Sequence, residues 1–362
     1  WKRPAYEDDG RKFSQRYAFA SSRNPELAMG RGILGAMKYD PLGSTFSQIY
    51  FGDPDQCFYV VWNDQFYDDP MPIKSSPWGH SKGALVWDAN GNGFVLQVST
   101  PSWPASGNQK FPRQHDGNTL GSVTDDDIEV SQHFFAFRVN ASDIRAILQG
   151  MINASVVTMP KSRQVVNNGG PEEIQELVGQ LGKKSTSTEC LVSTLSNGMQ
   201  LISKPSAMAV PPWQMVSAQL GGVDLRVASW WFKPAIYSTT RDTPVGCWDP
   251  SLGKPGAIEI ATTGYWKDGK KELTLGLEGG EGTNKNHAKF GVSTSGRRPL
   301  CLFGDLNQQG ALCEGYSSAK QKCSSSQNGR GGLFYVFSNR TLHSSMARLL
   351  SGQSAPTSPP GK

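Results

Sequence analysis

Two of the five histidines in this 362-residue sequence begin the same kind of tripeptide. The two copies are His80-Ser81-Lys82 and His287-Ala288-Lys289, one in each half of the chain. An imidazole can attack phosphorus and hold it covalently, which divides one difficult displacement into two easier ones. Lysine ammonium groups can stabilise the nonbridging oxygens, and a second imidazole can protonate the leaving oxygen. The paired motifs therefore predict cleavage of a phosphodiester without a metal ion.

A single His-x-Lys triplet is usually an accident at the edge of a strand, because short motifs often match by chance. Two copies in corresponding positions favour the chemical interpretation. Each copy leads into an apolar, strand-like stretch, and positions i and i+2 of a strand point to the same side. Each histidine should therefore present its ring beside the lysine of its own motif.

Apolar runs predict the elements that position the first motif. Strands are expected at residues 57–62, 84–88, 94–100 and 133–139. Helices are expected at 143–154, capped by Ser142, and at 171–182. Residues 89–93 predict a hairpin turn. The pattern Asp88-x-Asn90-x-Asn92-Gly93 copies the start of a calcium-binding loop, but Ser99 stands where the bidentate glutamate belongs, so we favour the turn.

The second half repeats this order. Strands are expected at 198–204, 223–232, 257–263, 289–293 and 333–338, followed by a helix at 340–350. We therefore expect two related α+β units: an N-terminal half at 1–165 with the first motif and a C-terminal half at 166–350 with the second. Residues 351–362 predict a disordered tail.

Composition narrows the class of protein. Only 19 % of the residues are charged, the net charge is +5, and Gly (40) and Pro (23) are abundant, which excludes a coiled coil and favours a loop-rich, strand-rich globular chain. No apolar run approaches the length of a membrane span. The six cysteines lack metal-ligand spacing. A disulfide within 301–323 and buried free thiols are equally compatible with their positions.

The segments around both motifs resemble the deoxyribonuclease II family. The first is GHSKGALVWD (79–88), preceded by WNDQ (62–65); the second is NHAKF (286–290), followed by GDLN (304–307) and RGG (330–332). The resemblance spans about residues 35–350 and is weakest at 155–250. Trp87 stands where the wider superfamily has Asp, and Phe290-Gly291 stands where animal enzymes have a Trp-Cys-like pair. These departures indicate a distant member of bacterial type.

The resemblance implies an α+β, phospholipase D-like fold of two pseudo-symmetric halves, each with a central β-sheet flanked by helices, and one shared active site. It implies a metal-independent acid endodeoxyribonuclease that needs no cofactor and leaves 3′-phosphate and 5′-hydroxyl ends through a phosphohistidine. The substrate would be double-stranded DNA. The protein would be extracytoplasmic: secreted or periplasmic in a bacterium, lysosomal in an animal.

The family's catalytic residues carry over to His80, Lys82, His287 and Lys289. We assign His80 as the nucleophile and His287 as the general acid. Asp305 and Asn307 follow the second motif, and one of them is expected to steady an imidazole through its other ring nitrogen. Asn118 is a looser first-half counterpart of Asn307. Two close histidines would lower the pH at which one is neutral, which favours an acidic optimum.

Binding of DNA requires cations for phosphates and aromatic faces for bases. The candidates near the motifs in sequence are Lys110, Arg113, Arg297, Arg298, Arg330 and Trp103, with Trp78 and Trp213 as further stacking surfaces. No recognition helix is evident, so we expect phosphate contacts to dominate and sequence preference to be low. We expect no membrane association and leave a homodimer open.

Two other functions remain open at this point. One is a phospholipase D-like phosphodiesterase acting on a lipid or a small molecule. The other is a catalytically inactive, extracytoplasmic DNA-binding protein. The mild basicity favours DNA over a neutral lipid, and the presence of both complete motifs favours an enzyme over an inactive binder.

Overall fold

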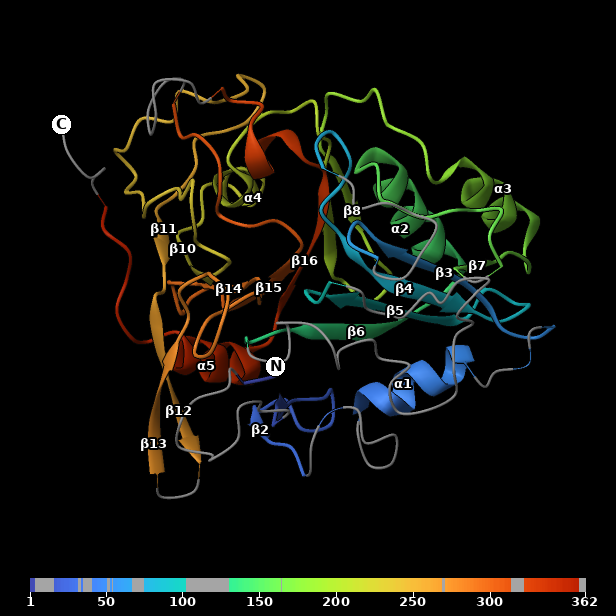
Figure 1. Ribbon diagram of the computed structural model, residues 1–362, viewed down its shortest axis with the longest axis horizontal. Helices are drawn as coiled ribbons and strands as arrows, with labels where there is room; N and C mark the ends of the chain where they lie inside the picture. The colour runs from blue at the N-terminus through green and yellow to red at the C-terminus, as the bar shows by residue number, and fades with distance from the viewer. Residues whose placement is uncertain are drawn as a thin grey trace.

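Two β-sheets form the framework of the protein in the computed structural model (Figure 1). The structure describes residues 1–3, 16–31, 34, 41–50, 53, 55–66, 75–101, 130–163, 165–268, 271–313 and 322–357. The N-terminal elements are β1 (Ala18–Phe19), β2 (Ala28–Met29) and α1 (Pro41–Tyr50), of which β1 and β2 pair with each other. The mixed α/β architecture agrees with the expected class.

The first sheet has five strands in the order β6-β5-β4-β3-β7. Its strands are β3 (Phe58–Asn63), β4 (Lys82–Trp87), β5 (Gly93–Val98), β6 (Phe134–Val139) and β7 (Val166–Asn167). The predicted hairpin between β4 and β5 is confirmed. Asp88 Oδ1 accepts the N–H groups of Asn90 and Asn92, and Gly91 has a φ of +75°, a conformation that favours glycine.

Two helices accompany the first sheet, α2 (Ala141–Asn153) and α3 (Glu172–Gln180). Both were predicted, but the cap of α2 is Asn140 and not Ser142. The Asn140 side chain accepts the N–H of Asp143, and the Asp143 carboxylate accepts the N–H of Asn140, which forms a reciprocal capping box. This box fixes the point at which the chain leaves β6 and enters the helix.

The second sheet has seven strands in the order β11-β10-β14-β15-β16-β9-β8. The strands are β8 (Leu191–Thr194), β9 (Gln200–Lys204), β10 (Leu225–Ala228), β11 (Ile258–Ile260), β14 (Phe290–Ser293), β15 (Leu300–Gly304) and β16 (Gly332–Ser338). The remaining elements are α4 (Pro212–Gln219), the β12–β13 hairpin (Thr263–Asp268 and Lys271–Gly276), the 3-10 helix η4 (Ser326–Gly329) and α5 (Arg340–Leu349).

The strand that follows each His-x-Lys motif has the same neighbours in both sheets. In the first sheet β3, β4, β5 and β6 are antiparallel neighbours, and α2 follows β6. In the second sheet β10, β14, β15 and β16 are antiparallel neighbours, and α5 follows β16. Each motif therefore lies at the start of the second strand in a matching row of four.

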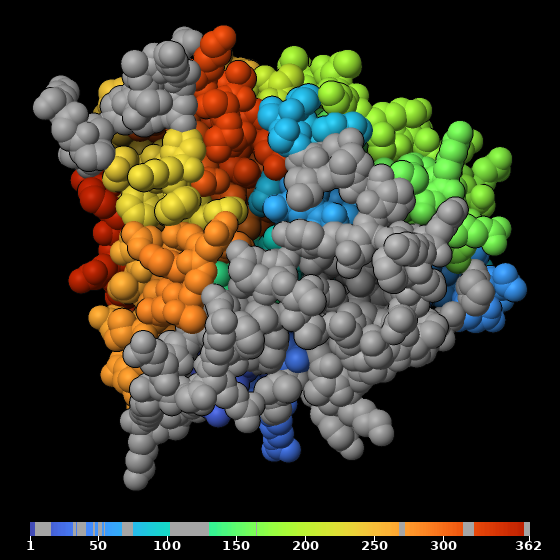
Figure 2. Space-filling model, viewed as in Figure 1, coloured from blue at the N-terminus to red at the C-terminus, as the bar shows by residue number. Residues whose placement is uncertain are grey.

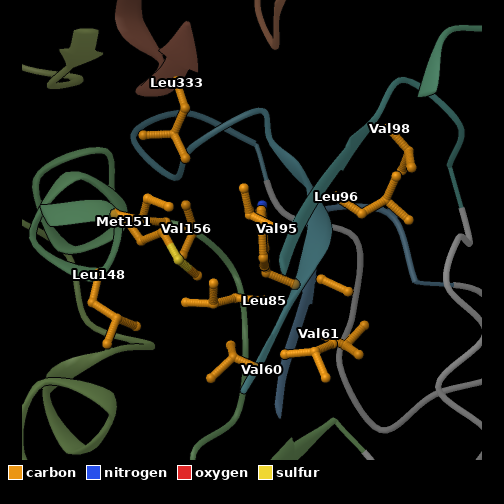
Figure 3. Close-up of a cluster of buried hydrophobic side chains, with 14 of the residues drawn as sticks. Val60, Val61, Leu85, Val95, Leu96, Val98, Leu148, Met151, Val156 and Leu333 are labelled. Atoms are coloured by element: carbon orange, nitrogen blue, oxygen red, sulfur yellow. The ribbon is translucent and has the colours of Figure 1, made fainter. Parts of the chain in front are cut away.

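The halves share part of their core. Leu333 of β16 belongs to the same buried cluster as Val95, Leu148 and Met151 of the first half (Figure 3). Gly150 lets α2 approach the second sheet, because a Cβ there would lie 3.2 Å from Leu201 Cδ2. The space-filling view shows residues of the two halves in contact along the middle of the molecule (Figure 2).

Aromatic rings line another part of this contact. Phe135 of β6 stacks on Phe303 of β15, with the ring centroids 4.3 Å apart and the planes at 4°. Phe137 meets Tyr335 of β16 edge to face at 5.2 Å. Offset and edge-to-face pairs of this kind add to the free energy of simple area burial. The two sheets are therefore packed on each other, which fixes the ends of β4 and β14 relative to one another.

Several boundaries differ from the expected ones. The expected boundary after residue 165 falls inside the first sheet, because β7 pairs with β3. The strand expected at 223–232 ends at Ala228, where the chain leaves the sheet. Helix α4 was not anticipated because residues 212–218 are buried on every side, so no amphipathic period marks it.

The expected disordered tail is wrong for residues 351–357. Ala355 is 3 % exposed and donates its N–H to Ile260 O, and Gln353 O accepts the N–H of Thr262. Backbone hydrogen bonds to the edge of the second sheet hold this segment. Residues 358–362 lie outside the described residues.

One disulfide, Cys247–Cys323, joins two loops of the second half. Of the cysteines in 301–323, Cys323 is in a disulfide, but its partner Cys247 lies outside that segment. Cys301 is a buried free thiol, the other alternative that the sequence left open. Among the helices of the described ranges, none combines the length and apolar character that a membrane crossing requires.

Candidate active site

The four residues of the two motifs are all buried at the ends of their strands. His80, Lys82, His287 and Lys289 are between 2 % and 6 % exposed. Lys82 is the first residue of β4, and Lys289 directly precedes β14. Buried lysines and histidines are rare unless hydrogen bonds or charges compensate them, so their partners decide what they can do.

The second half holds His80 in place. The His80 N–H donates to Gly331 O at 2.9 Å, and its Nδ1 lies 2.8 Å from Asp305 O. A carbonyl oxygen only accepts, so Nδ1 carries the hydrogen and Nε2 keeps a lone pair. The Lys82 ammonium lies 3.4 Å from that Nε2. His80 therefore keeps the lone pair of Nε2 next to a cation.

Asp64 anchors Lys82. Its side chain is 0 % exposed, accepts Lys82 Nζ at 2.6 Å through Oδ1 and accepts Arg330 Nη2 at 2.8 Å through Oδ2. Arg330 also donates to the carbonyls of Trp78 and Gly79, next to His80. One carboxylate from the first half therefore joins the lysine of the first motif to an arginine of the second half.

Burial and the surrounding charges lower the pKa of His80. Burial and the Lys82 ammonium hold the pKa of His80 well below 6.5; Asp64 opposes this shift, while Arg330 and Lys289 add to it. The contribution of Lys289 means that the cation of the second motif lies within electrostatic reach of His80. The two motifs therefore share one electrostatic environment.

The first half in turn holds the second motif. Ser131 O accepts the N–H groups of His287 and Ala288, at 2.9 and 3.2 Å. His133 Nδ1 accepts the N–H of Lys289 at 3.0 Å. Each motif is thus positioned by segments of the other half, and neither can take this geometry alone.

The ring of His287 is fixed on one face and at one edge. Trp230 stacks on it with the centroids 4.6 Å apart and the planes at 17°. Its Nε2 lies 3.2 Å from Gly280 O, so this nitrogen carries a hydrogen. The Lys289 ammonium donates to the His287 carbonyl at 2.6 Å. A carbonyl that accepts from one ring nitrogen stabilises the protonated form of the imidazole.

Asp305 supports the site differently from the expectation. The contact with the imidazole comes from its backbone carbonyl, while its carboxyl accepts Leu333 N–H at 2.8 Å and Gln97 Nε2–H at 3.0 Å. Burial raises the pKa of this carboxyl to about 7, against hydrogen bonds from Ser81 and Leu333 that lower it. At acid pH the group is therefore a neutral carboxylic acid.

Among the described residues, the hydrogen bonds of Asn307 go to side chains other than an imidazole. Its Nδ2 donates to Gln309 Oε1 at 3.2 Å and its N–H donates to Gln327 Oε1 at 3.3 Å. Its Oδ1 is buried and has no hydrogen-bond partner among the described residues. Asn307 therefore belongs to the loop beside the site, and its counterpart Asn118 lies outside the described residues.

The residues expected to bind DNA are dispersed. Lys110, Arg113 and Trp103 lie outside the described residues. Arg297 and Arg298 are exposed in the turn between β14 and β15, at the opposite end of these strands from Lys289. Arg330 is instead buried and forms an ion pair with Asp64. Sequence proximity to a motif was therefore a poor guide to these positions.

The two tryptophans expected as further stacking surfaces differ in their exposure. Trp213 is 0 % exposed, donates to Leu306 O and packs against Phe334, so it is not a stacking surface for DNA. Trp78 is half-buried beneath the Lys184 ammonium.

Within the described ranges, no three His, Cys, Asp or Glu side chains are grouped as ligands for a metal ion.

Four residues around the motifs were not anticipated as functional: Asp64, Ser131, His133 and Trp230. Asp64 carried a signal, because it lies in the family-like segment 62–65. The other three reach the second motif only through the packing of distant segments. His133 acts through its side chain, which accepts the backbone N–H of Lys289.

Comparisons with known proteins agree with this geometry. The family model described as Deoxyribonuclease II matches residues 1–355. A curated relative, the cell-death-related nuclease 7 of Caenorhabditis elegans, is 23 % identical over 292 residues, which cover 75 % of this chain and 68 % of the relative. The family match extends over nearly the whole chain and includes both His-x-Lys motifs. The chain therefore belongs to the deoxyribonuclease II family and is a DNA-hydrolysing enzyme.

Proposed function

We propose that this enzyme cleaves DNA by a two-step displacement in which its own lysines, and no metal ion, supply the positive charge. His80 Nε2 attacks phosphorus, the bond to the 5′-oxygen breaks, and His287 gives that oxygen its proton. A water molecule then loses a proton to His287 and attacks the 3′-phosphohistidine. The P–N bond breaks, which restores the lone pair of His80 and leaves 3′-phosphate and 5′-hydroxyl ends.

One observation carries this assignment of roles: Nδ1 of His80 is bonded to a backbone carbonyl, which leaves Nε2 as the nucleophile beside Lys82 Nζ at 3.4 Å. The Gly280 carbonyl that accepts from His287 Nε2 favours the protonated ring, which supports the complementary role of acid for His287. Lys82 and Lys289 are the cations suited to the nonbridging oxygens.

The electrostatics support an acidic optimum. The nucleophile must be neutral, and burial together with Lys82 lowers the pKa of His80 well below 6.5, so acid does not inactivate it readily. The general acid must be protonated, which an imidazole achieves below its ordinary pKa of about 6.5. The two requirements overlap in mildly acid solution.

The wider setting follows from the same features. We infer a phospholipase D-like arrangement of two related halves, which the matching rows β3-β4-β5-β6 and β10-β14-β15-β16 support. The Cys247–Cys323 disulfide supports an extracytoplasmic location, since disulfides persist in oxidising compartments. The absence of a groove-reading element among the described helices supports low sequence preference for double-stranded DNA.

The test is cleavage of supercoiled plasmid in excess EDTA at about pH 5, an acidity at which an ordinary imidazole is protonated. We expect cleavage to leave 3′-phosphate ends and to be lost in His80→Ala and His287→Ala. His343→Ala, which removes a histidine on α5, is the matched control. Cleavage that requires added magnesium, or that leaves 3′-hydroxyl ends, would contradict the mechanism. Hydrolysis of a choline lipid without DNA cleavage would instead favour a phospholipase.

A further inference from the structure

The loop that follows β10 presents three consecutive aromatic residues in three directions. Trp230 stacks on the catalytic His287. Trp231 packs against the core of the second half and donates its Nε1–H to Ile236 O at 3.0 Å. Phe232 is 49 % exposed, and the next residue, Lys233, is exposed as well. An exposed aromatic residue and an exposed cation are therefore adjacent in sequence, two and three residues after Trp230, whose ring covers His287.

Hydrogen bonds hold this loop to the segment that supports His80. Gln309 Nε2 donates to the carbonyls of Phe232 and Lys233, both at 3.3 Å, and Gln309 Oε1 accepts the amide of Asn307. Gly310 N–H donates to Pro234 O at 2.9 Å. These hydrogen bonds fix the backbone of the loop in a conformation that leaves the Phe232 side chain exposed.

Single exposed apolar residues are ordinary on protein surfaces and need no explanation by themselves. Phe19, Val192 and Tyr265 are also exposed, and they lie on the strands β1, β8 and β12. Phe232 differs because its loop contacts a catalytic ring and carries a cation, and residues 229–240 contain no acidic side chain. This combination matches a nucleic-acid strand, which offers flat bases and phosphates together.

We propose that Phe232 and Lys233 form a DNA subsite on the leaving-group side of the scissile bond. Phe232 stacks on the base of the nucleotide whose 5′-oxygen leaves, and Lys233 contacts a flanking phosphate. The side follows from the role of His287, which protonates that 5′-oxygen, so the inference rests on the proposed function. A base that stacks on Phe232 must leave its neighbours, so a duplex substrate has to unstack and unpair this one nucleotide at the site.

The test compares two oligonucleotides that differ at one position. One carries a normal nucleotide on the 3′ side of a chosen phosphodiester, and the other carries a tetrahydrofuran abasic analogue there; cleavage at that bond is read on a sequencing gel. Stacking of one base on one aromatic ring predicts that Phe232→Ala lowers kcat/KM on the normal strand about tenfold or more. On the abasic strand the same variant should match wild type. Phe232→Trp should retain activity on the normal strand, and Tyr265→Ala is the control for an exposed ring elsewhere.

Lys233→Gln provides a separate readout. Loss of one phosphate contact should reduce the slope of log KM against log salt concentration by about one unit. Equal losses on the normal and the abasic strand, or no loss in Phe232→Ala, would overturn the subsite while leaving the proposed function intact.

A binding measurement keeps the subsite testable apart from turnover. In a His80→Ala background, Phe232→Ala should weaken binding of a single-stranded oligonucleotide about tenfold by fluorescence anisotropy, and Tyr265→Ala should not. Unchanged affinity would again overturn the subsite. Failure of the wild type to cut either strand in EDTA would contradict the proposed function instead.

Discussion

Replacing Asp64 by Asn should destabilise the protein more than any surface charge replacement. The Asp64 carboxylate is 0 % exposed and bridges Lys82 Nζ at 2.6 Å and Arg330 Nη2 at 2.8 Å, whose side chains are 2 % and 10 % exposed. The amide keeps the shape of the carboxylate but removes its charge. Two buried cations then face each other without compensation.

The expected loss is about 3–5 kcal/mol, the usual consequence of removing one partner of a buried ion pair. That is a large part of the roughly 5–15 kcal/mol by which a folded domain is stable. At about 2 °C per kcal/mol for a large domain, Tm should fall by roughly 6–10 °C. Glu259→Gln is the matched control, since Glu259 pairs with Arg226 but is 43 % exposed, and should cost about 1 kcal/mol or less.

The pH dependence tests the cause. Burial alone would raise the pKa of Asp64, but Lys82 and Arg330 outweigh burial and hold that pKa below the ordinary value of 3.8. A depressed carboxyl pKa stabilises the fold above the unfolded value, and this stabilisation is lost as pH falls through the folded value. The difference between wild type and Asp64→Asn should therefore be complete at about pH 5 and shrink below about pH 4.

The measurement is thermal unfolding, followed by circular dichroism, at about pH 5 and at a pH below about 4. The reasoning is refuted if Asp64→Asn unfolds within about 1 kcal/mol of Glu259→Gln at the higher pH. It is also refuted if the difference from wild type is unchanged at the lower pH, because the charge would then not be its origin.

Three further predictions concern the surroundings of the motifs. Gly279→Ala should lower kcat about 100-fold, because a Cβ there would lie 2.1 Å from Trp230 Cδ1 and would displace the ring that orients the general acid; Gly296→Ala, with nothing within 4 Å, should cut plasmid like wild type. His133→Phe should lose about 1–3 kcal/mol in urea unfolding and most activity, because a backbone N–H loses its acceptor, whereas His133→Asn keeps an acceptor oxygen and should retain both. Asp305 should lower stability by on the order of 1.4 kcal/mol per pH unit as pH rises from about 4 to 7, because its pKa is raised from 3.8 to about 7 in the folded protein. The buried His80 has a lowered pKa and acts in the opposite direction, so the measurement is the difference between wild type and Asp305→Asn in urea titrations. The stability of the variant should rise with pH relative to wild type by that amount, and an unchanged slope would contradict the assignment.

Local patterns in the sequence predicted several elements well. The hairpin at 89–93 follows from its turn residues, the strand at 333–338 from a continuous apolar run, and the helix at 340–350 from the helical spacing of its apolar residues. Helix α4 escaped because it is apolar on all faces, and the end of β10 was misplaced because Trp230 leaves the sheet to cover an imidazole.

The two His-x-Lys motifs could be recognised from the sequence because their residue types are specific, but the residues that support them could not. His80 forms hydrogen bonds with residues 305 and 331, and Ser131 and His133 form hydrogen bonds with the second motif. Each of these bonds joins segments that are more than 150 positions apart in the sequence. No local spacing encodes such contacts. For the same reason Arg330 was expected at a phosphate, although a buried carboxylate from the first half holds it.

The reciprocal support of the motifs has a consequence for the cell that makes this nuclease. Chains grow from the N-terminus, and early segments begin to fold while later ones are still being added. His80 meets its partners only when residues 305 and 331 have been synthesised, and Asp64 meets Arg330 at the same late stage. An unfinished chain therefore holds the side chains of its first motif before the contacts that position them can form.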